Sequence, residues 1–66
     1  GNLEVEKYAR AAEIYIGDVY NLVNEIIFYK NRGENEQFLR YWTEIRLKDC
    51  RKSLSKLEEN PFFCFV

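Results

Sequence analysis

The sequence contains no histidine and no methionine, and only one proline, three glycines and two cysteines. The absence of histidine removes the most common general base and the Ser-His and Cys-His pairs of nucleophilic enzymes. Three scattered glycines cannot form a glycine-rich phosphate-binding loop. We therefore expect no enzyme activity, no catalytic residue and no cofactor.

The two cysteines, Cys50 and Cys64, are too few for a disulfide scaffold. Without histidine or a Cys-x-x-Cys motif they make a poor zinc site, and we expect no metal ligands. They are interpreted as reduced, buried small hydrophobic residues. The alternative is a disulfide between them, which requires the C-terminal tail to fold back over the last helical turns.

No apolar run approaches the roughly 18 residues that span a membrane. The net charge of −1 creates no overall field that would attract nucleic acid or an anionic membrane. We expect a domain excised from a larger intracellular protein, cytoplasmic rather than nuclear.

Hydrophobic and aromatic residues are plentiful, at 47% and 17% of 66 residues. A chain of this length buries only about 60% of the surface that its unfolded form exposes. Such a composition therefore predicts either a dense core or a surface for association.

The stretch Ile14–Tyr20 can be interpreted in two ways. Its β-branched residues and the Gly17-Asp18 dipeptide are typical of a β-hairpin. However, apolar residues on both sides alternate in steps of three and four, as at the a and d positions of a heptad. These residues are Val5, Tyr8, Ala12, Tyr15, Val19, Leu22, Ile26 and Tyr29. Because this pattern crosses Gly17 without a change of phase, it predicts one helix over about residues 3–31, with Asn2 as its N-cap.

This predicted helix is apolar on more than one side. The e positions hold Ala9, Ile16 and Val23, and the b and c positions, where a two-helix hairpin should be polar, hold Ile14, Tyr20, Ile27 and Phe28. Gly17 falls at an f position and is either a tolerated surface glycine or a point where another backbone approaches closely. One neighbouring helix cannot cover all of these residues, so we expect a second contact face.

A short polar turn over residues 32–35 follows, with Gly33 as the left-handed C′ residue and Asn35 as the N-cap of a second helix. That helix is predicted over about residues 36–59, because Asn60-Pro61 ends it. A short turn makes the helices antiparallel neighbours. The predicted fold is all-α, an antiparallel helical hairpin that completes a four-helix bundle by dimerisation or by binding a partner.

The apolar residues of the second helix fall on two faces. The first half contributes Phe38, Tyr41, Trp42 and Ile45, and the second half Leu47, Cys50, Leu54 and Leu57. Either the helix bends near residues 47–49, or its two halves contact different surfaces. We favour the second interpretation. Ser53 and Ser55 are expected on the solvated surface.

Residues 61–66, Pro-Phe-Phe-Cys-Phe-Val, form an apolar tail. Its phenylalanines are expected to cap the end of the bundle or to pack on a partner subunit. Alternatives are the beginning of a following element, a C-terminal ligand for a carboxylate-binding pocket, or a membrane contact.

The second helix is basic, with six basic and two acidic residues between Arg40 and Leu57, and the first helix is more acidic. We interpret this bias as complementarity between helices or subunits. The alternative is a small helical nucleic-acid-binding domain, with contacts from Arg46, Lys48, Arg51 and Lys52.

Ile16-Gly17-x-x-Tyr20 is similar to the Leu-Gly-x-x-Tyr core of the first helix of tetratricopeptide repeats, and Pro61 stands where such repeats place a proline. Glu13 stands where that pattern has Trp, and both predicted helices are longer than those of the repeat. The similarity covers five residues and assigns no family.

We therefore predict a protein–protein interaction module, for oligomerisation or docking, whose partner is a second copy or a helix of another protein. The predicted interface residues are Tyr15, Tyr20, Ile27, Phe28, Trp42, Leu54, Leu57, Phe62, Phe63 and Phe65.

Overall fold

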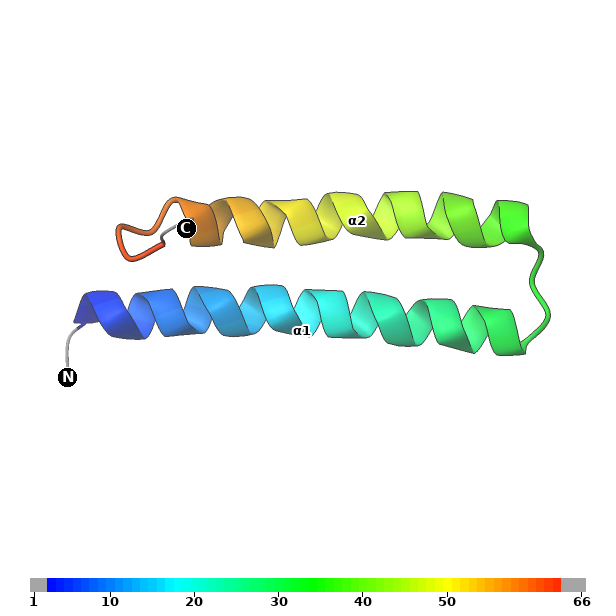
Figure 1. Cartoon of the computed structure of the whole chain (residues 1–66), viewed down its shortest axis with the longest axis horizontal. Helices are drawn as coiled ribbons and strands as arrows, with labels where there is room; N and C mark the ends of the chain where they lie inside the picture. The colour runs from blue at the N-terminus through cyan, green and yellow to red at the C-terminus, as the bar shows by residue number, and fades with distance from the viewer. Residues whose placement is uncertain (1–2, 64–66) are drawn as a thin grey trace.

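The computed structural model describes residues 3–63 and consists of two antiparallel helices, α1 over Leu3–Asn31 and α2 over Glu36–Glu58 (Figure 1). Its dimensions are 47 × 19 × 18 Å. α1 begins and α2 ends at the same end of the hairpin. No strand occurs within residues 3–63, so the all-α helical hairpin is confirmed.

α1 runs through Gly17 without interruption, so the helical interpretation of Ile14–Tyr20 is correct and the β-hairpin is excluded. A Cβ placed on Gly17 would meet no atom within 4 Å. The backbone therefore makes no close approach there within the hairpin, and the glycine is not needed for the packing of α1 on α2. The predicted N-cap, Asn2, lies outside the described residues.

The turn ends α1 with a Schellman motif. Gly33 has a φ of +85°, which a glycine adopts without steric cost. Its N–H donates to the carbonyl of Lys30 at 3.0 Å, and the N–H of Glu34 donates to the carbonyl of Tyr29 at 3.2 Å. These two bonds satisfy carbonyls that the end of the helix would leave open, and they confirm Gly33 as the C′ residue.

Asn35 begins α2 as predicted. Its backbone is extended, and its side-chain oxygen accepts a hydrogen bond from the N–H of Phe38 at 2.8 Å. This bond satisfies one of the open N–H groups of the first turn. α2 ends at Glu58, one residue before the predicted end and three before Pro61, and Glu59 is its cap.

The predicted a and d face of α1 lies against α2. Leu22 is buried, and Tyr8, Ala12, Tyr15, Val19, Ile26 and Tyr29 are half-buried, while Val5 near the open end is exposed. α2 contributes the buried side chains of Cys50 and Leu57. Two helices enclose only a thin core, since even these side chains keep a little exposed surface.

Ser53 is buried in this core, and the expectation that it lies on the solvated surface is wrong. Its hydroxyl donates to the carbonyl of Cys50 at 2.9 Å, so the buried oxygen has a partner. A small side chain that bonds its own helix fits where α1 and α2 approach each other.

Both halves of α2 lie along α1, and Figure 1 shows α2 as one straight helix. Near the turn, the ring of Tyr29 lies edge-on to Phe38 and to Trp42, with centroids 5.2 and 5.4 Å apart. Towards the open end, Cys50 and Leu57 are the hydrophobic side chains of α2 that are buried against α1. Both halves of α2 thus contact α1, whereas Tyr41, Ile45 and Leu47 of its two apolar faces stay exposed.

Beyond α2 the chain folds back towards the start of α1. The side chain of Asn60 accepts a hydrogen bond from the N–H of Phe62 at 2.9 Å. The ring of Phe62 lies 6.4 Å from the ring of Tyr8, centroid to centroid. Cys64, and with it the possible disulfide to Cys50, lies outside the described residues.

Candidate interaction surface

The hairpin has two flanks on which the sides of both helices meet solvent. We call the first the apolar flank. Its exposed members have between 38% and 67% of their surface open to solvent. They are Val5, Ile16, Tyr20, Val23 and Ile27 of α1 and Leu47 of α2. Exposure of this kind over one continuous patch is uncommon in a monomer, where apolar residues are normally scattered.

The α1 part of the apolar flank is a straight stripe. Its positions follow one another in steps of three or four residues, which places them on one side of a helix. They are Val5, Ala9, Ala12, Ile16, Tyr20, Val23 and Ile27, of which Ala12 is half-buried at the edge nearest α2 and the others are exposed. No member is charged, and the stripe covers 22 residue steps, or about 33 Å at the rise of an α-helix.

A groove of about 320 Å³ lies between this stripe and α2. Its lining is mainly apolar and consists of Tyr15, Val19, Leu22, Leu47, Cys50, Arg51 and Leu54. The groove joins the exposed stripe of α1 to the apolar edge of α2. The apolar flank is thus one surface built from both helices.

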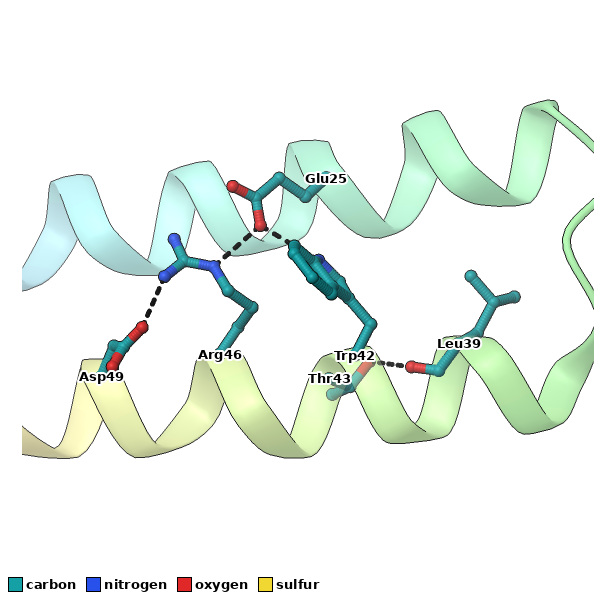
Figure 2. Close-up of polar contacts among 6 residues, drawn as sticks. All are labelled: Glu25, Leu39, Trp42, Thr43, Arg46 and Asp49. Carbon is teal, nitrogen blue, oxygen red and sulfur yellow. Dashed lines mark hydrogen bonds and ion pairs between the residues drawn. The ribbon is translucent and has the colours of Figure 1, made fainter.

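The opposite flank, which we call the polar flank, carries the polar network of Figure 2. Glu25 projects from α1 and accepts hydrogen bonds from the Trp42 indole N–H at 3.1 Å and from the Nε of Arg46 at 2.8 Å. Arg46 also donates to Asp49 at 2.7 Å. The hydrogen bond to Glu25 is the main cause that raises the pKa of Arg46, a side chain that is charged at physiological pH in any environment.

The network joins the helices at one register. Arg46 and Glu25 are only 23% and 36% exposed, so water screens their attraction less than that of a surface pair. Thr43, also drawn in Figure 2, makes only a local bond within α2, to the carbonyl of Leu39 at 2.7 Å. Glu25, Trp42, Arg46 and Asp49 have hydrogen-bond partners inside the hairpin.

The predicted interface residues divide among three places. Tyr20 and Ile27 lie on the apolar flank, and Tyr15 and Leu54 line the adjacent groove. Phe28 and Trp42 lie together on the polar flank, where Trp42 bonds Glu25.

The remaining predicted interface residues lie near the open end. Leu57 is buried inside the hairpin, Phe62 is exposed and Phe63 is half-buried. Phe65 lies outside the described residues. The structure thus brings only part of the predicted set onto one surface.

Sequence reasoning did not select Ile16, Val23, Val5 or Leu47 as interface residues, although they are prominent on the apolar flank. A signal was present, because the first three share one side of α1 with Tyr20 and Ile27. The heptad pattern places Val5 at an a or d position, and Ile16 and Val23 at the e positions that widen the same stripe.

Among the basic residues predicted as nucleic-acid contacts, Arg46 faces α1, whereas Lys48, Arg51 and Lys52 are exposed. Within residues 3–63 no three His, Cys, Asp or Glu side chains are grouped as metal ligands would be. In the same range, neither helix has the length and apolarity to cross a membrane.

Comparisons with protein-family models, with curated proteins and with solved structures find no match to this chain. Its function is therefore inferred from its own residues.

Proposed function

We propose that this chain is a protein–protein interaction module, an oligomerisation or docking domain of a larger intracellular protein in the cytoplasm. The observation that carries the proposal is the apolar flank, an uncharged stripe of α1 that the hairpin leaves open. Burial of such a stripe is favourable by roughly 25 cal/mol for each Å² removed from water.

The exposed area supports association. The chain of 8.0 kDa exposes 5514 Å². A compact monomer of this mass exposes roughly 4,500 Å². The difference of roughly 1,000 Å² per chain is comparable to the roughly 800 Å² that each partner buries in a standard protein–protein interface.

The dimensions agree with this comparison. The radius of gyration is 14.9 Å. A compact chain of 66 residues has about 11 Å, and one of twice that length about 14 Å. The radius of gyration of one hairpin thus already reaches that of a compact protein of two such chains. This is expected of an elongated hairpin that forms half of a four-helix bundle.

The test is the solution mass of the chain by sedimentation equilibrium from micromolar to millimolar concentration. We expect the mass to rise from 8.0 kDa towards twice that value. A chain that stays at 8.0 kDa up to millimolar concentration would contradict self-association and leave only docking on another protein.

The nucleic-acid alternative has less support, because Arg46 is bonded to Glu25 and Asp49. Titration with single- and double-stranded oligonucleotides at about 50 and about 200 mM salt separates the two functions, since phosphate contacts weaken steeply with salt. Binding that falls by orders of magnitude over this range would favour the nucleic-acid alternative.

A further inference from the structure

The occupant of the apolar flank can be specified from the spacing of its residues. We infer that it is a second copy of this chain, whose α1 lies antiparallel to the first across a two-fold axis at Ile16. This inference rests on the proposed function and names the partner and the register.

The stripe is symmetric about Ile16. Outward from this residue the steps are four, three and four residues in both directions, through Ala12, Ala9 and Val5 on one side and Tyr20, Val23 and Ile27 on the other. A two-fold axis requires each surface patch to complement itself. A stripe with this spacing meets that requirement when Ile16 of one copy lies opposite Ile16 of the other.

The side-chain sizes favour the antiparallel orientation. In that pairing the large Tyr20 faces the small Ala12 of the second copy, and Val23 faces Ala9. Large residues opposite small ones interdigitate and fill the space between helices. Parallel pairing would place Tyr20 on Tyr20 and Ala12 on Ala12, which crowds one level and leaves a gap at the other.

The charges at the ends of α1 also favour this orientation. Its first turn carries Glu4 and Glu6, and its last turn carries Lys30. Antiparallel pairing brings the acidic end of one copy towards the basic end of the other and sets the two helix dipoles in opposition. Parallel pairing would bring like charges together.

The position of the stripe on α1 predicts a four-helix bundle. At about 100° per residue, the stripe lies about 100° around α1 from the side that contacts α2. When two hairpins join through this side, their four helices lie at the corners of a square in a view along the helix axes. In this arrangement the α2 helix of one copy lies beside the α2 helix of the other. The groove lined by Leu47 and Leu54 then faces the second copy and is closed by it.

A charge-swap experiment tests partner and register together. Val5→Glu and Ile27→Lys each place a charge opposite an apolar residue, and both sites are exposed in the hairpin, so folding should survive. We expect each variant alone to raise the dimer dissociation constant at least about 10-fold. In an equimolar mixture Glu at position 5 faces Lys at position 27, and we expect a heterodimer about 10-fold tighter than either homodimer.

The matched control is a mixture of Val5→Glu with Val5→Lys, which pairs only if the helices are parallel. If the heterodimer is tighter than the homodimers in this control mixture but not in the first mixture, the antiparallel register is wrong. If the unmodified chain dimerises but no substitution matters, the inference fails while the proposed function stands. If the unmodified chain is a monomer at all concentrations, the inference fails, and the proposed function retains only docking on another protein.

Discussion

The two flanks of the hairpin expose hydrophobic side chains to a similar extent. They differ in whether charged residues lie beside these side chains. On the polar flank Ile14 is 53% exposed and lies one turn from both Arg10 and Asp18. Phe28 is 55% exposed, and the guanidinium of Arg32 lies 5.5 Å from its ring centroid. On the apolar flank the stripe of α1 contains no charge over its whole length.

On the proposed function, continuity, more than exposure, is what makes the apolar flank a surface for association. Single exposed hydrophobic residues are normal in monomers, whereas an uninterrupted patch is not. The flanks have separate roles on this account. The polar flank fixes α1 against α2 through Glu25 and Arg46, and the apolar flank remains for another chain.

The largest expected effect comes from two exposed isoleucines that lie two residues apart on different flanks. Ile16→Glu puts a charge at the proposed two-fold axis, and we expect the dimer dissociation constant to rise by about 100-fold or more. Ile14→Glu, on the polar flank, should change it by less than about 3-fold. Sedimentation equilibrium measures both, and equal effects would abolish the distinction between the flanks.

The polar flank should act on folding. Glu25→Gln keeps the shape of the side chain but removes the charge that Arg46 bonds, and we expect the free energy of unfolding to fall by about 1 kcal/mol. The control is Glu13→Gln at an exposed site of the same helix, with an effect within about 0.5 kcal/mol. Urea denaturation measures both, and equal losses would show that the network contributes nothing.

Gly17 tests how far around α1 the second chain reaches. Because a Cβ at this position meets no atom within 4 Å, Gly17→Ala should stabilise the helix by about 0.5–1 kcal/mol. The dissociation constant should be unchanged, since Gly17 lies off the stripe. Loss of the dimer would mean that the interface covers Gly17, and the apolar flank would then have been assigned to the wrong side of α1.

Salt should have the smallest effect on association. Between about 0.1 and about 1 M NaCl we expect the dissociation constant to change by less than about 3-fold or to decrease, because the stripe at the centre of the interface carries no charge that salt could screen. The same titration on Glu25→Gln is the control for effects on folding. A strong weakening with salt would indicate that ion pairs hold the chains together.

Much of the fold could be predicted from the sequence. The heptad pattern gave the extent of α1, and Gly33 and Asn35 marked the turn, because these features act locally along the chain. The side of α2 that contacts α1 was harder to predict. It runs from Phe38 and Trp42 to Cys50 and Leu57, so Ser53 came to be buried although its residue type favours the surface.

The candidate surface was predicted only in part, for a physical reason. Trp42 is a frequent residue of interfaces, but its ring and N–H are both used within the hairpin, by Tyr29 and Glu25. Sequence alone does not show which aromatic residues already have partners. The exposure of the stripe through Ile16 depends on which side of α1 the second helix covers, and only the structure shows this side.

The most direct test of the account is an isotope-filtered nuclear Overhauser experiment on a mixture of labelled and unlabelled chains, which reports only contacts between chains. The account predicts contacts between the ring of Tyr20 and the methyl group of Ala12, and between the Ile16 side chains of the two copies. Contacts between chains that involve Ile14 or Phe28 and none from the stripe, or no such contact at millimolar concentration, would contradict it.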